Sequence, residues 1–411
     1  MVVVGAGPAG AATSILLAQQ GYRVVLVDRA GFPRDKACAE YLSPACTPIL
    51  ERLGALAAVR AAAPQQLEGM RVTDYRGRAC LGRFVLHGHP AYGLALPRRT
   101  FDHLLVEHAC RVGVEVRLGF WVRQPLLRDR QVCGVVGEVG RRREALRAPL
   151  VIAADGLHST LARRLRLIRR VRWPDHLAMV MHWQEVAPLF PWGEMFLFPG
   201  GYLGLAPVGK KLVNVSLVLR RAQLAACRLA PAQWVAAALQ AHPELRRRFA
   251  RAKPVRGPLV VGPLAQQTAW PRHGGILLVG DAAGFFDPFT GEGIFLALHG
   301  AELAAAAAHR ALQRGDVSAA GLRPYFVAHR RAFAARYRLS ALIQLGLYLP
   351  WLANAVIGRL AACPGAADTL VSVTGDLLPP GEVLSWRFLW RLAFPGVPWP
   401  TRRARAESPR Q

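Results

Sequence analysis

The sequence contains very little lysine and few acidic residues. Its 53 basic side chains include only four lysines, and together with 26 acidic side chains they leave a formal net charge of +27. A charge of this size raises nucleic acid as a partner. However, the chain has no zinc-finger, helix-turn-helix or RNA-binding aromatic motif, and alanine is heavily used as well as arginine. We therefore interpret the charge as a compositional bias and predict no binding to nucleic acid.

Cysteine and histidine patterns that hold disulfides or metals are also missing. The seven cysteines are odd in number and form no Cys-x-x-Cys pair, which argues against a disulfide framework and a cysteine zinc site. No histidine pair has the spacing of a helical metal site, so we interpret the twelve histidines as surface or structural residues and predict no metal. No secretory leader precedes the glycines that begin at Gly5, which favours a cytoplasmic protein of unassigned oligomeric state.

One uncharged stretch, Leu339–Gly358, is long enough to cross a bilayer. Gln344, Pro350 and Asn354 interrupt it, so we expect a buried or membrane-surface pair of helices instead of a span. With the positive charge, this stretch favours peripheral contact with the cytoplasmic face of a membrane.

Strand, glycine turn, helix and strand follow one another in the first thirty residues. Val2–Val4 is apolar, Pro8–Gln20 has apolar residues at helical spacing, and Tyr22–Val27 is a second apolar run that ends at Asp28. Strands that alternate with helices predict a parallel sheet. Between about 166 and 267, short apolar segments separated by proline and glycine predict a mainly antiparallel sheet instead.

The first turn has the G-x-G-x-x-G pattern of dinucleotide-binding proteins, in the form Gly5-Ala6-Gly7-Pro8-Ala9-Gly10. Its first glycine permits the tight turn, its second lets the backbone approach a pyrophosphate, and its third lets helix and strand pack closely. The helix N-terminus then offers N–H groups to the phosphates. Asp28 follows the second strand, where its carboxylate can accept hydrogen bonds from ribose hydroxyls, and we include its neighbour Arg29 in the site.

A second glycine turn indicates FAD instead of NAD. Gly280-Asp281 follows the apolar run Ile276–Val279 and precedes a loop rich in glycine. Asp281 can hydrogen-bond a polyol chain, and the glycines allow close approach to a flat ring. FAD has both a ribitol and a ring, whereas NAD has no ribitol.

Three motifs in order resemble the superfamily of FAD-dependent monooxygenases and geranylgeranyl reductases, whose fold is that of p-hydroxybenzoate hydroxylase. They are the first glycine turn, Asp155-Gly156 with Ser159, and Gly280-Asp281. The resemblance implies that Arg98 helps to hold the pyrophosphate and that Asp281 contacts the ribitol. It also implies that the isoalloxazine ring is lined by Pro288, Gly291, Gly293 and Ile294. The arginine usual three residues after the serine is here displaced by one position, to Arg163.

The resemblance implies an α/β fold in three parts. We expect a Rossmann-like FAD-binding domain whose parallel sheet carries a three-stranded crossover, a mainly antiparallel β substrate domain, and a helical, apolar C-terminal region. The predicted boundaries are 1–70, 96–165 and 268–335 for the FAD-binding domain, 71–95 and 166–267 for the substrate domain, 336–400 for the helical region and 401–411 for a disordered tail.

Two further segments bear on the reaction. Lys36–Glu40 resembles the Lys-x-Cys-Gly-Glu motif of prenyl reductases, which implies that Cys38 lies near the flavin as a proton donor; the alternative is a small buried hydrophobic residue. Pro199–Pro207 resembles the reductase signature P-x-x-Y-x-W-x-F-P and matches it at Tyr202, but small residues, Gly204 and Ala206, replace the two aromatics.

We therefore predict an FAD-dependent oxidoreductase with a hydrophobic, lipid-like or polyketide or phenolic substrate. The small residues favour a monooxygenase driven by NADH or NADPH, with a prenyl double-bond reductase as the second hypothesis. A reductase needs a proton donor, for which Cys38 and Tyr202 are the candidates. A catalytically silent flavin-binding protein is the alternative from another class, and the absence of Trp-x-Trp-x-Ile-Pro argues against a halogenase.

Overall fold

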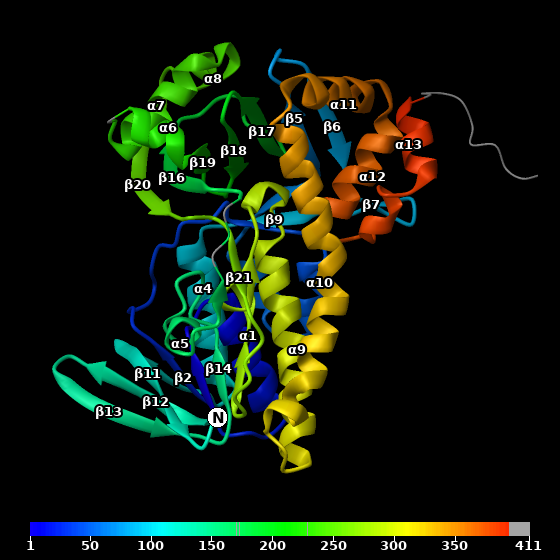
Figure 1. Cartoon of the computed structure of the whole chain (residues 1–411). Coiled ribbons are helices and arrows are strands. Elements are labelled where there is room, and N and C mark those ends of the chain that lie inside the picture. Colours follow the sequence, from blue (N-terminus) through cyan, green and yellow to red (C-terminus); the bar gives the residue numbers. More distant parts are fainter. Residues whose placement is uncertain (170, 172, 228, 394–411) are drawn as a thin grey trace, which may run out of the picture.

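The chain forms two lobes, and a long helix, α10, runs beside both of them (Figure 1). This computed structural model describes residues 1–169, 171, 173–227 and 229–393. The predicted tail, 401–411, and the last residues of the predicted helical region, 394–400, lie outside the described residues.

A five-stranded sheet forms the centre of the lobe that contains the N-terminus, with the strand order β10–β2–β1–β14–β22. All four strand pairs are parallel, which confirms the predicted parallel sheet. The second strand begins later than predicted, because the N–H of Tyr22 bonds the Leu17 carbonyl and completes the end of the preceding helix. The strands are β1 Val2–Val4, β2 Val25–Asp28, β10 Glu115–Leu118, β14 Val151–Ala153 and β22 Ile276–Leu278.

Helices cover one face of this sheet and a second sheet covers the other. The helices are α1 (Pro8–Gln19), α4 (Arg98–Arg111) and α9 (Gly293–Gln313), and their apolar residues share a core with the sheet. The three-stranded antiparallel sheet on the other face confirms the predicted crossover, and both faces of the parallel strands are therefore buried. Its strands are β11 Phe120–Arg128, β12 Gln131–Val139 and β13 Arg142–Arg147.

The other lobe is built on a seven-stranded sheet with the order β20–β16–β19–β18–β17–β5–β6. Only the β17–β5 pair is parallel, so the predicted mainly antiparallel sheet is confirmed. Its strands are β5 Gly69–Thr73, β6 Ala79–Arg83, β16 His176–Gln184, β17 Gly193–Phe198, β18 Gly201–Pro207, β19 Val213–Arg220 and β20 Lys253–Val261.

Side chains alternate between the two faces of this sheet. One face packs against α7 (Pro231–Ala241) and α8 (Pro243–Arg248), with Leu203 and Val215 in that core. The opposite face carries Tyr202 and packs against the C-terminal helices. This second face is therefore the one that meets the rest of the molecule.

The C-terminal region is helical, as predicted for its described part. A sharp bend of 112° separates α10 from α11 at Tyr348–Leu349, where Pro350 starts the new helix. No single helix among the described residues has both the length and the apolar composition of a membrane span, and the bent pair α10–α11 alone meets these criteria jointly. The helices are α10 Ala319–Leu347, α11 Pro350–Ala362, α12 Pro364–Thr374 and α13 Trp386–Ala393.

Shorter elements connect these layers. They are the helices α2 Cys46–Arg52, α3 Leu56–Ala61, α5 Thr160–Arg164 and α6 Arg221–Ala226, the 3-10 turns η1 Gly280–Ala282, η2 Pro288–Thr290 and η3 Pro380–Glu382, and the strands β3 Tyr41–Leu42, β4 Gln65–Leu67, β7 Val85–Leu86, β8 His89–Pro90, β9 Gly93–Ala95, β15 Ile168–Arg169, β21 Gln266–Thr268 and β23 Gly284–Phe285.

Candidate active site

The first glycine turn has no room for side chains at two of its glycines. Gly5 has a φ of +101°, and a Cβ there would lie 2.3 Å from the carbonyl oxygen of Ala154. A Cβ on Gly10 would lie only 1.8 Å from the carbonyl oxygen of Gly5. These contacts explain both glycines by backbone packing, since real Cβ atoms do not approach that closely.

Gly7 differs because it has open space beside it. The nearest atoms to an added Cβ would be guanidinium nitrogens of Arg34 and Arg98, at 3.7 and 3.9 Å. Gly7 is also the N-cap of α1, so free backbone N–H groups and two guanidinium groups face the same space. Charged donors of this kind are what a pyrophosphate requires.

Arg98 is held in place by a buried carboxylate. Its Nε and Nη2 atoms bond the two oxygens of Asp102 at 2.6 and 2.8 Å, and Arg34 pairs with the same carboxylate at 3.2 Å. Burial acts to lower the pKa of Arg98, but attraction to Asp102 and Cys38 outweighs it and raises that pKa. Arg98 therefore stays charged beside the glycine turn, which supports its predicted role at the pyrophosphate.

Asp28 closes the turn from the end of β2. Its carboxylate accepts the N–H groups of Ala6 at 2.7 Å and Ala30 at 2.8 Å, and each oxygen keeps a lone pair that a ribose hydroxyl could use. Arg29 is exposed beside it. Burial, and the charges of Lys36, Arg163 and Arg29, lower the pKa of His158, so these cations lie together around that histidine.

Asp155 links the first turn to α5. Its carboxylate accepts the N–H of Thr160 at 2.6 Å, while Gly156 has a φ of +78°. The other oxygen is buried and has no hydrogen-bond partner among the described residues, and burial raises the pKa of this carboxyl. An added Cβ on Gly5 would also lie 2.9 Å from the Asp155 backbone, so the motif borders the dinucleotide turn.

The second glycine turn packs directly on the first. Gly280 has a φ of +62°, and a Cβ there would lie 2.9 Å from the side chain of Ala9. Burial raises the pKa of the neighbouring Asp281, and the charges of Lys36 and Arg98 oppose that rise. Two turns far apart in sequence thus share one cationic space.

The predicted ring-binding loop continues from this turn. Pro288 begins η2, and Gly291 has a φ of +73° with the Tyr41 ring beside it, 2.9 Å from where a Cβ would lie. Gly293 begins α9 with open space around it, and Ile294 is buried next to it. The site fits FAD, because it combines open space at Gly7, the guanidinium groups of Arg34 and Arg98 for the pyrophosphate, and the carboxyl group of Asp281 on the second glycine turn for the ribitol.

A hydrogen-bond cluster that we call the Cys38 cluster lies between this loop and the large sheet. Asn214 donates to the Cys38 carbonyl at 2.9 Å, and the Cys38 sulfur accepts the Glu40 N–H at 3.3 Å. Glu40 accepts the Arg98 backbone N–H at 2.8 Å and is hydrogen-bonded to His182 at 2.6 Å. Glu40 holds a φ of +60°, which is uncommon outside glycine and fixes the segment that carries the thiol.

A second cluster, which we call the Asp287 cluster, gathers donors from four elements around one buried carboxylate. Asp287 accepts the Tyr202 hydroxyl at 2.5 Å and the Phe289 N–H at 3.1 Å, together with the Gln344 amide. It is also bonded to Nδ1 of His176 at 2.6 Å. Burial and Asp287 raise the pKa of Tyr202 well above its ordinary value. The Tyr202 hydroxyl therefore keeps its proton and donates it in a hydrogen bond to Asp287.

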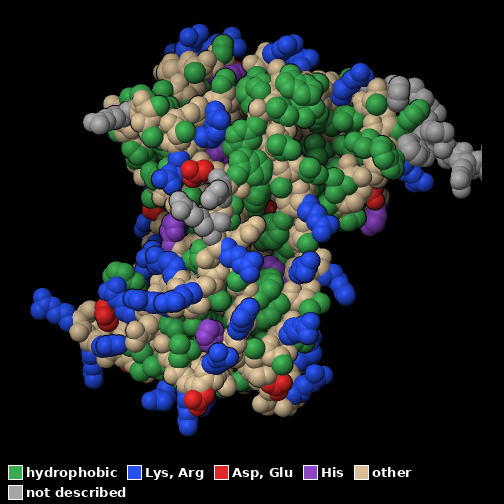
Figure 2. All heavy atoms as spheres, viewed as in Figure 1, with side chains coloured by type: hydrophobic (Ala, Val, Ile, Leu, Met, Phe, Trp, Pro, Cys, Tyr) green, Lys and Arg blue, Asp and Glu red, His purple; other side chains and the backbone are tan. Residues whose placement is uncertain are grey.

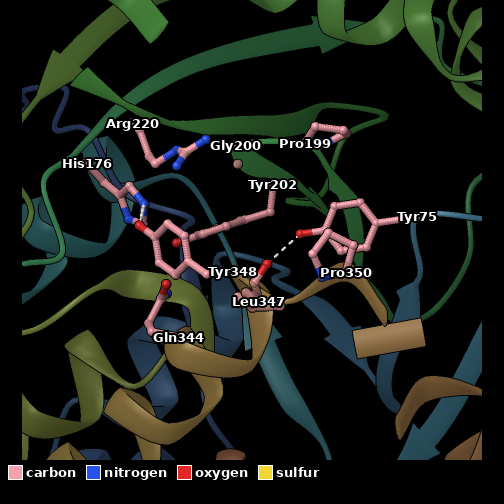
Figure 3. A pocket seen from close by; sticks show the side chains of 11 residues that line it. Tyr75, His176, Pro199, Gly200, Tyr202, Arg220, Gln344, Leu347, Tyr348 and Pro350 are labelled. Atoms are coloured by element: carbon pink, nitrogen blue, oxygen red, sulfur yellow. Dashed lines mark hydrogen bonds between the residues drawn. The ribbon is translucent and has the colours of Figure 1, made fainter. Parts of the chain in front are cut away.

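A pocket of about 160 Å³ adjoins the Asp287 cluster (Figure 3). Tyr202 and Tyr348 point into the same region, and Tyr348 bonds Nε2 of His176 at 2.5 Å. Leu347 and Pro350, from the bend between α10 and α11, line the pocket as well. The pocket thus joins a polar hydrogen-bond chain to the apolar C-terminal helices.

Strand register places the two clusters on one face of the sheet. Tyr202 pairs with Val218 and Ala206 with Asn214, so four residues, or about 13 Å, separate them along the strands. Gly204 lies between them on the same face. In the same row, Met195 and Ser216 flank Gly204, and the Met195 sulfur would lie 3.2 Å from a Cβ on Gly204.

Two histidines lie in the site, although all twelve were predicted to be surface or structural residues. His176 and His182 lie six residues apart on β16 and therefore face the same side of the sheet, each bonded to a buried acid. Even spacing along an expected strand was the signal available. Their acidic partners, Asp287 and Glu40, belong to distant segments, so this spacing could not predict them.

A shared arginine also ties the ring-binding loop to the C-terminal region. Arg336 pairs with Glu292 at 3.2 Å and with Asp376. Burial, and then repulsion from Glu292, raise the pKa of Asp376; burial also raises the pKa of Glu292, although Arg336 opposes both rises. The folded protein therefore binds more protons here than the unfolded chain, whose carboxyls titrate near pH 4.

Because the folded protein holds these protons more tightly than the unfolded chain, the free energy of unfolding should fall as the pH rises above 5. We expect Asp376→Asn to flatten the decline in the free energy of unfolding between pH 5 and 8, measured by urea titration. Asp316→Asn is the control, because hydrogen bonds from Ser318 lower the pKa of Asp316 and place its effect below this range. An unchanged slope in Asp376→Asn would contradict the assignment.

Known proteins show the same architecture and sequence pattern. The family described as FAD binding domain matches residues 1–337. Digeranylgeranylglycerophospholipid reductase 2 of Methanopyrus kandleri is 29% identical over 92% of this chain and 93% of its own length. Reductase 1 of the same organism is 31% identical over 79% of this chain and 84% of its own. A flavoprotein/dehydrogenase from Cytophaga hutchinsonii has the same fold, with a TM-score of 0.80 at 20% identity over 91% of each chain. The chain therefore belongs to the FAD-binding-domain family, within the superfamily of FAD-dependent monooxygenases and geranylgeranyl reductases, and is an FAD-dependent oxidoreductase.

Proposed function

We propose that the protein is an FAD-dependent reductase that saturates double bonds in the prenyl chain of a lipid-like substrate. The observation that carries this proposal is the position of the Cys38 thiol. Its sulfur accepts the Glu40 N–H and interacts with the charged Arg98. The segment that carries it contacts the ring-binding loop, where Tyr41 lies beside Gly291. The names of the similar reductases support the same reaction. This choice reverses the order of the sequence-based hypotheses, in which a monooxygenase stood first.

The residues present can carry the proton half of such a reduction. When bound, FAD would supply hydride-transfer chemistry between NADH or NADPH and one carbon of the alkene. The other carbon must gain a proton. In our proposal the S–H bond of Cys38 breaks and the new C–H bond forms. The Glu40 N–H and the positive charge of Arg98 then stabilise the thiolate.

The same face of the sheet can receive an apolar chain. The row between the Cys38 cluster and the Asp287 cluster holds the apolar Met195 and Val180 beside Gly204, and Leu347 and Pro350 line the pocket. An apolar substrate that covers these residues would also exclude water from the reacting carbons.

A monooxygenase is the second candidate, and one observation favours it. Reductases of this type carry aromatic residues where this chain has Gly204 and Ala206, and the loss of these two aromatic side chains favours a different substrate, such as a ring or a polyketide. The Met195 sulfur takes part of the space beside Gly204. Such an enzyme would need O2 and would have no use for a thiol proton donor.

Turnover with and without oxygen separates these functions. We expect anaerobic enzyme with NADH or NADPH to add one H2 per double bond to a prenyl lipid, measured by mass spectrometry. Oxygen-dependent insertion of an oxygen atom into a lipid-linked phenol would identify the monooxygenase instead. A yellow protein that oxidises neither nicotinamide cofactor with any substrate of the panel would be the catalytically silent flavoprotein.

A further inference from the structure

An apolar face lies on the outside of the C-terminal helices, and we call it the docking face. Hydrophobic side chains gather over α11 and α13 on one side of the molecule (Figure 2). Trp351 is 68% exposed and Trp386 78%, although tryptophan is usually well buried. The other large exposed members are Leu342, Leu345, Leu349, Leu384 and Leu389.

The spacing of these residues shows that the face is separate from the core. Leu342, Leu345 and Leu349 follow one another at helical spacing on the outer side of α10 and its end. Leu339 and Ile357 point the other way and are buried against the large sheet. The helices are thus apolar on two sides, and in the described part of the chain only one of these sides is covered by protein.

The charges around the face are all of one sign on the three helices that form it. Residues 319–347, 350–362 and 386–393 contain no aspartate or glutamate. Arg338 continues the outer stripe of α10, Arg359 lies two turns after Trp351 on α11, and Arg387 and Arg391 flank the apolar residues of α13. All four arginines are exposed. Tryptophans and arginines that border an apolar patch are typical of a membrane interface.

We propose that α10, α11 and α13 form a monotopic docking face that binds the surface of an anionic bilayer. The tryptophans and leucines enter the interface, and the arginines pair with anionic headgroups. No described single helix meets the criteria of a membrane span, and the pair α10–α11 that meets them jointly is bent by 112°.

The bend that carries this face also reaches the pocket. Leu347, Tyr348 and Pro350 lie between the exposed Leu345 and Trp351 and line the pocket beside Tyr202. If the proposed function holds, a prenyl chain can pass from the bilayer into the pocket without crossing bulk water. This step rests on the proposed function, whereas bilayer binding does not.

Vesicle sedimentation tests the docking face with the full chain. We expect the wild type to bind phosphatidylcholine vesicles that contain phosphatidylglycerol, and Trp351→Ala/Trp386→Ala to bind them at least about 10-fold more weakly. Arg338→Gln/Arg359→Gln should lose affinity for these vesicles but not for pure phosphatidylcholine. Trp121→Ala is the matched control, because Trp121 is 44% exposed on β11 in the other lobe.

Several results would overturn the proposal. They are equal vesicle binding by the wild type and the double tryptophan variant, an equal loss in Trp121→Ala, or a dimer in solution that depends on Trp351. Activity gives a separate reading: the double tryptophan variant should keep its turnover of a short, water-soluble prenyl alcohol and lose turnover of a vesicle-bound lipid. If the wild type binds vesicles but turns over neither substrate, the proposed function is rejected and the proposal of a docking face is retained.

Discussion

Gly7→Ala is expected to weaken FAD binding by at least about 100-fold, or roughly 2.8 kcal/mol, without destabilising the apoprotein. Apart from its own chain neighbours, the added methyl group would lie no closer than 3.7 Å to the rest of the protein, and the φ of −72° at this position suits alanine. It would, however, occupy the space that the helix N-terminus and Arg98 leave beside the turn. Only a ligand in that space would meet it.

Two other glycines make this test specific. Gly10→Ala places its Cβ 1.8 Å from a carbonyl oxygen and should lower both FAD affinity and the melting temperature of the apoprotein. Gly365→Ala in α12 meets nothing within 4 Å outside its own helix and should lower neither the FAD affinity nor the melting temperature. Affinity can be measured by flavin fluorescence during reconstitution, and stability by circular dichroism. Wild-type FAD affinity in Gly7→Ala would mean that the pyrophosphate lies elsewhere.

The turns were predictable from sequence because their demands are local. Gly5 needs a φ of +101° and Gly10 contacts the Gly5 carbonyl, and a short strand–turn–helix motif carries both demands. The additional contact of Gly5 with Ala154 comes from a residue distant in sequence and could not be predicted in this way. The Cys38 cluster is different, because Glu40 and His182 meet only once β16 is placed in the large sheet. No local pattern encodes the order or register of that sheet.

The sequence also could not decide whether Tyr202 or Cys38 is the proton donor, because the deciding partner is distant in sequence. Both residues match reductase motifs, and both side chains can give up a proton. Asp287, which accepts the Tyr202 hydroxyl, belongs to the ring-binding loop and is distant in sequence. The direction of a hydroxyl proton depends on such a partner, so the choice between the two donors required the fold.

Cys38→Ala is expected to lower kcat for alkene reduction by about 10²- to 10⁴-fold, the usual contribution of a positioned general acid. FAD affinity should stay within a few fold, because Arg98 remains paired with Asp102. The rate of flavin reduction by NADH or NADPH should also persist, since that half-reaction needs no proton from the thiol. Stopped-flow absorbance under anaerobic conditions separates the two half-reactions.

Tyr202→Phe provides the comparison that decides between the two donors. Its hydroxyl proton faces Asp287 and its pKa is raised, so we expect kcat to fall much less than in Cys38→Ala and the pH profile of kcat to keep its shape. Loss of the hydrogen bond should still destabilise the fold by about 1–2 kcal/mol. Tyr325→Phe, which removes a buried hydroxyl bonded to the Leu278 carbonyl at 2.6 Å, should cost similar stability with full activity. A larger loss of kcat in Tyr202→Phe than in Cys38→Ala would make the tyrosine the proton donor, and Asp287 would then be the group that holds it in place.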